Sequence, residues 1–356
     1  MLLKFLVSFA CSMLLSESAF GQPAASIGHW KRLPTLPDPI GFAGIFAGVS
    51  GLSLLVAGGA NFPDRKPWEG GVKTWSDKVF VLEGLTNRAW KMAGQLPRPL
   101  GYGVSITTPS GVICVGGSDS QRHYRDVFLM SWKTEKQSLT FEPLPPLPEP
   151  CANACGAFLD GAIYIAGGIQ EPSSKMALKT FWSLDLRKQE RGWQQLAPWP
   201  GPERMLAVAG AHDGSFFLFS GAALKEGKES KPVRVWFRDA YRYTPGAGWK
   251  KLADLPRAAV AAPSPSFVRN GELLISGGDD GSQVDAAPTQ HKGFPRDVLA
   301  YNPKTDRWRR AALMPFSLVT TVAAPWGRFV VIPGGEERPG IRSTGVWALE
   351  PQLNSP

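Results

Sequence analysis

The chain has 356 residues with 39 glycines, 32 prolines and a formal net charge of +9. Glycine and proline are too frequent for a helical or α/β protein, whereas 43% hydrophobic residues and thirteen tryptophans exclude a disordered chain. The lysines and arginines are scattered singly, so the charge indicates a basic surface or an anionic ligand and not a nucleic-acid partner. The composition therefore predicts many short strands separated by tight turns.

The first 21 residues have the pattern of an export signal. A positive start (MLLK) precedes an apolar run at 5–15 and a small-residue site ahead of Gln22. The run is too short to span a bilayer, so we expect a soluble mature protein of residues 22–356, exported to the periplasm. Its cysteines (Cys114, Cys151 and Cys155) have apolar neighbours and are expected to be buried thiols without a disulfide framework.

Two interleaved series of short segments repeat along the chain. Apolar strands that end in small residues recur six times, at 54–59, 112–117, 163–168, 216–222, 273–278 and 329–335. Between them, a tryptophan strand leads into a proline turn, at 36–39, 96–99, 147–150, 199–202, 255–258 and 314–317. With two further strands of alternating pattern in each unit, the series predicts an all-β, six-bladed propeller of four-stranded blades.

The repeat resembles the Kelch repeat over residues 28 to 350, because a strand ending in Gly-Gly is followed by an aspartate-led aromatic strand and a tryptophan. The last unit lacks a tryptophan strand, whereas the strand at 29–34 has no unit of its own. We therefore expect 29–34 to complete the blade formed by 318–350, which removes the exposed edges of an open ring.

Strand direction alternates within each blade, so the loops after the Gly-Gly strands share one face with the proline turns. Arg98, Arg204 and Arg257 follow prolines of those turns in separate blades, and Asn153 does so in another. Together with Asn61 they are candidate substrate-binding residues, because converging guanidinium groups bind carboxylates or phosphates. The alternative is that each arginine pairs with a nearby acid, for example Asp38, Glu149 or Glu203.

The same face carries the longest loops, at 60–76, 222–236 and 279–296. Trp68 and Trp75 are suited either to stacking on a sugar ring or to packing against the propeller. His123 and His291 are single histidines in loops, for which a surface position is the default. Because the four histidines form no paired ligand motif, neither a metal centre nor a cofactor is expected.

Three segments point to a narrower family: GFAGIFAGVSGLSLLVAGGANFP (41–63), LPRPLGYGVS (96–105) and the charged loop that begins at Gly335. They resemble the bacterial Kelch-type N-acetylneuraminate epimerases, or sialic acid mutarotases. That family's Gly-Glu-x-x-Pro-Gly-x-Arg loop is matched by Gly335, Glu336, Pro339, Gly340 and Arg342. Here the loop belongs to the closing blade and not to one in mid-chain, which resembles the cyclically permuted branch of the family.

The resemblance implies an isomerase that converts the α anomer of N-acetylneuraminate to the β anomer outside the cytoplasm, with Glu336 and Arg342 as the catalytic pair. Such an exchange needs a base for the anomeric hydroxyl and an acid for the ring oxygen, which one carboxylate can supply in turn. Two other interpretations stay open from the residues themselves. One is an epimerase or lyase acting on another anionic sugar, and the other is a non-catalytic propeller that binds an anionic glycan or a protein.

Overall fold

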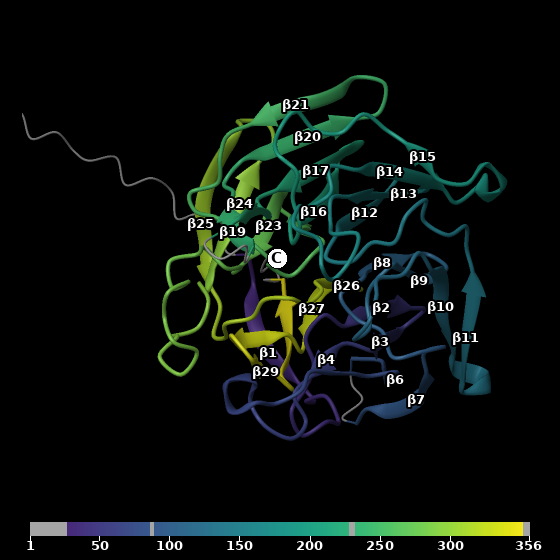
Figure 1. Ribbon diagram of the computed structural model, residues 1–356. Coiled ribbons are helices and arrows are strands. Elements are labelled where there is room, and N and C mark those ends of the chain that lie inside the picture. Colours follow the sequence, from purple (N-terminus) through teal and green to yellow (C-terminus); the bar gives the residue numbers. More distant parts are fainter. Residues whose placement is uncertain (1–26, 86–88, 228–231, 352–356) are drawn as a thin grey trace, which may run out of the picture.

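The structure is a computed structural model that describes residues 27–85, 89–227 and 232–351. Six four-stranded antiparallel sheets surround a central axis, which confirms the predicted six-bladed propeller (Figure 1). From the axis outward the first three are β2 (Phe46–Ser50), β3 (Ser53–Ala57), β6 (Lys78–Glu83), β7 (Lys91–Gln95); β8 (Val104–Thr108), β9 (Gly111–Val115), β10 (Val127–Lys133), β11 (Ser138–Pro143); and β12 (Cys155–Leu159), β13 (Ala162–Ala166), β14 (Phe181–Asp185), β15 (Gln194–Gln195).

The other three blades follow the same order. They are β16 (Val208–His212), β17 (Ser215–Phe219), β20 (Ala240–Thr244), β21 (Gly248–Leu252); β22 (Phe267–Arg269), β23 (Glu272–Ser276), β24 (Asp297–Asn302), β25 (Arg307–Leu313); and β26 (Ala324–Trp326), β27 (Phe329–Pro333), β30 (Val346–Glu350), β1 (His29–Leu33). The loops add three ribbons: β4 (Ala60–Asn61) with β5 (Thr74–Trp75), β18 (Ala222–Glu226) with β19 (Pro232–Trp236), and β28 (Glu336–Arg338) with β29 (Ile341–Arg342).

Helical structure is confined to short turns in the described part of the chain. Three 3₁₀ turns occur there, η1 (Pro67–Glu69), η2 (Thr134–Lys136) and η3 (Gln189–Arg191). Among the described residues, no helix has the length and apolar character needed to cross a membrane.

The last blade is closed by the first strand of the chain. β1 pairs antiparallel with β30, with Trp30 opposite Leu349 and Leu33 opposite Val346. The orphan tryptophan strand therefore occupies the place predicted for it. The charged loop near the C-terminus connects β27 to β30, the second and third strands of that blade.

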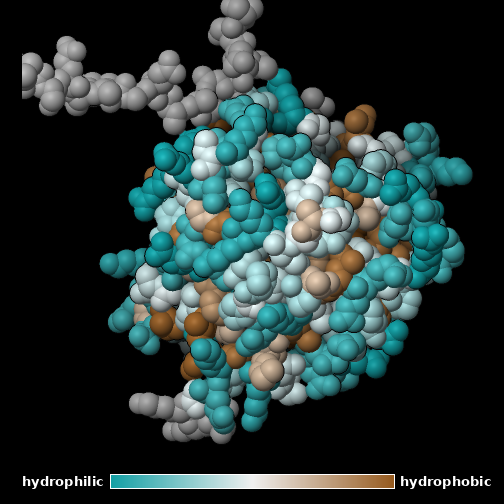
Figure 2. All heavy atoms as spheres, turned by 90° about the horizontal axis from the view of Figure 1, so that it is seen from above, coloured by the Kyte–Doolittle hydropathy of each residue, from teal (hydrophilic) through white to brown (hydrophobic). Residues whose placement is uncertain are grey.

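The hydrophobic core lies between the blades. Six main clusters of buried side chains each join two neighbouring sheets; one of them packs Leu54 and Phe80 of the first blade against Val331 of the last. The face seen in Figure 2 is largely hydrophilic, with scattered hydrophobic patches. The three described cysteines are buried free thiols, as expected, and burial raises the pKa of Cys151 and Cys155 to about 12.

Tryptophans on the outer strands tie neighbouring blades together, as predicted. In four of them the indole N–H donates to a backbone carbonyl in the turn that leaves the preceding blade, whereas Trp30 makes no such bond. The pairs are Trp90 to Pro34, Trp193 to Pro145, Trp249 to Ala197 and Trp308 to Ala253, at 2.7–2.9 Å. The repeated tryptophan is therefore a structural residue.

A closed circuit of backbone hydrogen bonds surrounds the channel where the chain enters each inner strand. Each member donates its N–H to the carbonyl of the equivalent residue in the preceding blade, and the last link joins Gly44 to Thr320; all six distances are 2.7–2.8 Å. All members have positive φ, between 55° and 66°. We call this circuit the backbone ring; its members are Gly44, Tyr102, Asn153, Leu206, Ala261 and Thr320.

The seam between the last and first blades contains the same hydrogen bond as other pairs of neighbouring blades, where Gly59 donates to Leu100 and Gly117 to Cys151. Gly335, at φ 103°, donates its N–H to the carbonyl of Phe42 in the first blade (2.8 Å). A Cβ at Gly335 would lie 2.9 Å from the carbonyl oxygen of Val319, so only glycine fits this approach.

Removal of β1 tests the closure. Because β1 supplies the outer edge of the closing blade and buries Leu33, a chain that begins at residue 35 should lose most of its stability. Thermal unfolding followed by circular dichroism measures the effect. A truncated chain with the melting temperature of the full chain would contradict the assigned closure.

Substitution of Ala261 tests the backbone ring. Ala261→Pro removes the N–H that bonds Leu206 and forbids the observed φ of 56°, so it should lower the free energy of unfolding by about 3 kcal/mol or more. Ala261→Gly is the control, because glycine adopts positive φ freely, and its effect should stay within about 1 kcal/mol. Urea denaturation measures both variants, and equal effects would exclude a structural role for the ring.

Candidate active site

Glu336 lies at the mouth of the channel, in the hairpin formed by β28 and β29. Its backbone exchanges two hydrogen bonds with Val319 (2.9 and 3.0 Å), the residue before Thr320 of the backbone ring. Its side chain is 19% exposed. The backbone of Glu336 is thus fixed beside the residue that precedes the backbone ring, and its carboxylate is partly exposed to solvent.

The two oxygens of the Glu336 carboxylate have different surroundings. Oε1 accepts the backbone N–H of Gly340 at 2.7 Å and lies 2.6 Å from Nη1 of Arg342. Oε2 makes no hydrogen bond to the described residues. One oxygen therefore anchors the side chain, and the other has no hydrogen-bond partner among the described residues.

The Arg342 guanidinium is buried beside this carboxylate, with a side chain only 4% exposed. Its Nε donates to the carbonyl of Ala60 (3.1 Å), and the group lies 5.1 Å from the ring centre of Phe62. Nη1 forms an ion pair with Oε1 of Glu336 at 2.6 Å. Nη2 makes no hydrogen bond to the described residues.

The first blade supplies the other wall of this site. Asn61 on β4 is buried, and its amide nitrogen donates to the carbonyl of Gly41 (3.1 Å). Its side-chain oxygen makes no hydrogen bond to the described residues. Gly340 packs closely against Pro67 and Trp68 of the 60–76 loop. The sequence left the role of Trp68 and Trp75 open, and the structure places both beside the site, Trp75 with its ring centre 6.1 Å from that of Tyr102.

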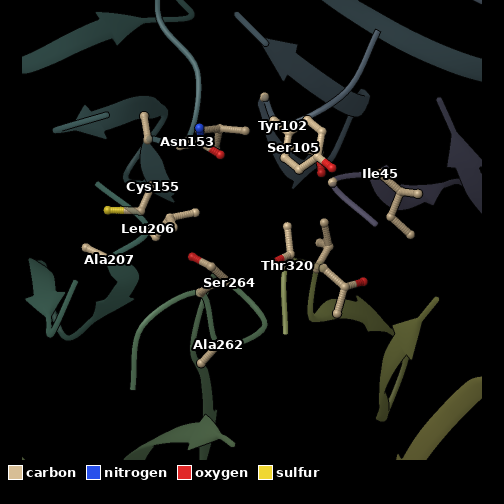
Figure 3. A pocket seen from close by; sticks show the side chains of 17 residues that line it. Ile45, Tyr102, Ser105, Asn153, Cys155, Leu206, Ala207, Ala262, Ser264 and Thr320 are labelled. Carbon is tan, nitrogen blue, oxygen red and sulfur yellow. The ribbon is translucent and has the colours of Figure 1, made fainter. Parts of the chain in front are cut away.

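A small cavity of about 70 Å³ occupies the channel at the backbone ring. Asn153, Tyr102, Ser105, Ser264 and Thr320 are among the residues that line it (Figure 3). The Asn153 amide makes no hydrogen bond to the described residues and is thus available to a ligand. Ligand pockets usually enclose about 300–1,000 Å³, so this cavity alone is small for a ligand site.

The three arginines that the sequence predicted to converge on a ligand are each paired with an aspartate. Each aspartate stands just before or at the start of the third strand of the same blade. The pairs are Arg98 with Asp126 (2.6 Å), Arg204 with Asp239 (2.7 Å) and Arg257 with Asp297 (2.6 Å). The predicted alternative, pairing with an acid, therefore describes these contacts, although with other partners than Asp38, Glu149 or Glu203. Substrate binding by these arginines stays a prediction, which their structural contacts do not support.

Arg204 illustrates why these pairs belong to the scaffold. Its side chain is 0% exposed, makes a bidentate contact with Asp239 and donates to the carbonyl of Ser220 (2.7 Å). Burial raises the pKa of Asp239, but the hydrogen bonds and charge of Arg204 and the Tyr241 hydroxyl lower it more, so its pKa lies below the usual value. A buried guanidinium with these partners does not reach a ligand.

Both loop histidines are buried, so the expected surface position is wrong. His123 is 8% exposed and its Nδ1 donates to the carbonyl of Ile169 (3.0 Å), whereas His291 is 5% exposed and its Nδ1 accepts the N–H of Gly293 (3.1 Å). Burial lowers the pKa of each imidazole. These hydrogen bonds to the backbone hold the loops in their conformation, a role that the spacing of histidines in the sequence does not reveal.

The fold and site define a six-bladed propeller with a carboxylate–guanidinium pair at the channel mouth, and comparison with known proteins identifies its family. The family model described as N-acetylneuraminate epimerase matches residues 16–139 and 144–287, and the chain belongs to that family. The match ends before the loop that carries Glu336 and Arg342.

Individual relatives agree with this assignment. The N-acetylneuraminate epimerase of Brucella suis is 39% identical over 120 residues, which cover 29% of this chain and 30% of the relative. The corresponding proteins of Haemophilus influenzae strain PittEE (28% identical over 231 residues) and Escherichia coli O6:H1 (27% over 234) each match 58% of this chain and 59% of their own length. The chain thus spans less than two thirds of the length of these curated relatives.

A solved structure supports the fold independently. The entire propeller is similar to the structure titled "Structure of YjhT", with a TM-score of 0.65 and 16% sequence identity, over 91% of this chain and 98% of the other. At this identity the similarity concerns the fold.

Arg204→Met tests the scaffold role of the buried pair. Removing the guanidinium leaves Asp239 buried without its partner, so the free energy of unfolding should fall by about 3–5 kcal/mol at pH 7. Arg98→Met removes the equivalent but exposed pair with Asp126, in which the two side chains are 40% and 46% exposed. It should lower the free energy of unfolding by less than about 1 kcal/mol. Urea denaturation measures both. Similar losses in the two variants would show that burial does not set the strength of these pairs.

The same pair predicts a pH dependence. Because the pKa of Asp239 is lowered in the folded protein, its stabilisation is present above the unfolded value of about 4 and is lost as the pH falls through the folded pKa. The difference in unfolding free energy between the unsubstituted protein and Arg204→Met should therefore shrink below about pH 4. A constant difference from pH 7 to pH 3 would contradict this assignment.

Proposed function

We propose that this protein is an exported mutarotase that interconverts the α and β anomers of N-acetylneuraminate, as the names of its family and relatives suggest. The observation that carries the proposal is the Glu336–Arg342 pair. It combines an anchored carboxylate that has one free oxygen with a buried guanidinium that has unused N–H groups. We further infer a Kelch-type repeat, a signal peptide at 1–21 and a periplasmic location, which the sequence pattern supports.

The chemistry of anomer exchange fits these two groups. The free Oε2 of Glu336 takes the proton of the anomeric hydroxyl as the bond between the anomeric carbon and the ring oxygen breaks. The same proton passes from the carboxylate to the ring oxygen. The open-chain keto form is produced, and Glu336 returns to its ionised form. Rotation about the bond next to the keto carbon presents its other face, and the reverse steps close the ring to the second anomer.

Arg342 supports the same steps without exchanging a proton. Its Nη2, which makes no hydrogen bond to the described residues, can donate to the anomeric oxygen while that oxygen carries partial negative charge. Its Nε bond to Ala60 and its contact with Phe62 fix the guanidinium before substrate arrives. Such a preformed donor stabilises the ring-opening transition state without reorganisation.

Glu336→Gln tests the mechanism. Glutamine keeps the size of the side chain but takes no proton, so catalysed exchange should fall by about 10²–10⁴-fold while the fold and sugar binding remain. Proton NMR resolves the two anomers and follows fresh sugar over time, with the spontaneous rate subtracted at each pH.

Glu337→Gln is the matched control, because Glu337 is adjacent, equally acidic and exposed. It should keep the exchange rate of the unsubstituted protein. Loss in Glu337→Gln alone would move the catalytic carboxylate by one residue. If the unsubstituted protein never exceeds the spontaneous rate, the enzyme proposal is wrong and a sugar-binding propeller replaces it.

A further inference from the structure

Lys73 places an ammonium group beside the cavity, although the sequence did not single it out. It lies in the 60–76 loop directly before β5, and its Nζ is 5.0 Å from the ring centre of Tyr102 and 5.4 Å from that of Trp75. Tyr102 is a member of the backbone ring and lines the cavity (Figure 3). The ammonium of Lys73 is thus held over an aromatic wall of the mouth.

The charge of Lys73 has no counter-ion in the described structure. Within residues 27–85, 89–227 and 232–351, no carboxylate oxygen lies within 4.0 Å of its Nζ, whereas Arg98, Arg204 and Arg257 each have an aspartate. The side chain is half-buried, so two aromatic rings replace part of its hydration. A cation held in this way attracts an anionic ligand more strongly than a freely hydrated surface lysine does.

A second donor next to Lys73 also lacks a partner. The indole Nε1 of Trp75 is buried and has no acceptor among the described residues. Since buried tryptophan N–H groups nearly always find an acceptor, a ligand or water oxygen is the expected partner. Lys73 and Trp75 therefore offer two unused donors within three residues of each other.

The same ribbon connects Lys73 with the catalytic pair. β5, which follows Lys73, pairs through Trp75 with Ala60 of β4, and the carbonyl of Ala60 accepts the Arg342 Nε at 3.1 Å. The ammonium and the guanidinium are thus fixed to the two strands of one short ribbon. This arrangement suits a ligand with an anionic group close to the atom that reacts at Glu336.

We propose that Lys73 binds the carboxylate of the substrate and selects sugars that carry a carboxylate on the anomeric carbon. The inference rests on the proposed function and adds the group that recognises the acid. In a cyclic 2-keto acid the carboxylate and the anomeric hydroxyl share one carbon, so holding the carboxylate at Lys73 orients the hydroxyl toward Glu336. A neutral aldose lacks that anchor.

Binding and exchange of N-acetylneuraminate are compared with those of its methyl ester, which has the same ring without the negative charge. In Lys73→Met the dissociation constant of the acid should rise about 10- to 100-fold, the usual effect of losing one charge-assisted contact, while that of the ester stays unchanged. Lys73→Arg should restore part of the affinity for the acid, because it keeps the charge. Calorimetric titration measures binding, and anomer-resolved NMR measures exchange.

Lys78→Met is the matched control, because Lys78 is an exposed lysine at the start of β6, five residues along the chain. It should leave the affinity for both sugars unchanged. Raising the salt concentration should weaken binding of the acid to the unsubstituted protein more than to Lys73→Met. Trp75→Phe keeps an aromatic ring but removes the indole N–H. It should weaken binding of the acid by a smaller factor than Lys73→Met does, because Lys73 stays in place.

The outcomes separate this inference from the proposed function. Equal losses for acid and ester in Lys73→Met, or no loss for either, would overturn the role of Lys73 even if the protein is a mutarotase. If the protein binds the acid through Lys73 but never accelerates exchange, the recognition holds and the catalytic proposal is wrong. If it binds neither sugar, both are wrong.

Discussion

The backbone ring is the constraint on which the rest of the structure depends. Six residues in left-handed conformation each bond the preceding blade, and the circuit closes only because the first and last blades meet at Gly44 and Thr320. The ring fixes where each inner strand begins and narrows the channel to a cavity of about 70 Å³. A cavity of this size is small for a ligand, whereas the loops around the mouth differ from blade to blade and are where binding sites are usually built.

The repeats provide an internal comparison that separates scaffold from site. The arginine–aspartate pairs recur at equivalent positions in three blades, and the tryptophan-to-carbonyl hydrogen bonds recur in four. A contact that the architecture repeats serves the architecture. The contacts of Glu336, Arg342 and Lys73 have no such counterparts. That difference separates the contacts of the repeated turns, which stabilise the fold, from contacts that single loops make once.

The propeller could be predicted from the sequence because its signals are local and periodic. Strands ending in Gly-Gly, outer tryptophans and the orphan strand at 29–34 each mark one place in a repeated unit, and all took the predicted positions. The arginine partners could not be predicted, because Asp126, Asp239 and Asp297 lie 28, 35 and 40 residues away and are brought close only by the blade's third strand. The position of Lys73 could not be predicted for a similar reason, because its contact with Tyr102 joins a loop of one blade to the start of the next.

The site lies at the seam where the chain closes on itself. Arg342, near the C-terminal end, bonds Ala60 of the first blade; Gly340 packs on Pro67, and Gly335 bonds Phe42. The acid–guanidinium pair and the loop that carries the ammonium group thus come from opposite ends of the sequence and are brought to one seam by closure of the ring. In a closed ring every blade has two neighbours wherever the chain begins, so the first and last blades pack against each other as the other neighbouring blades do.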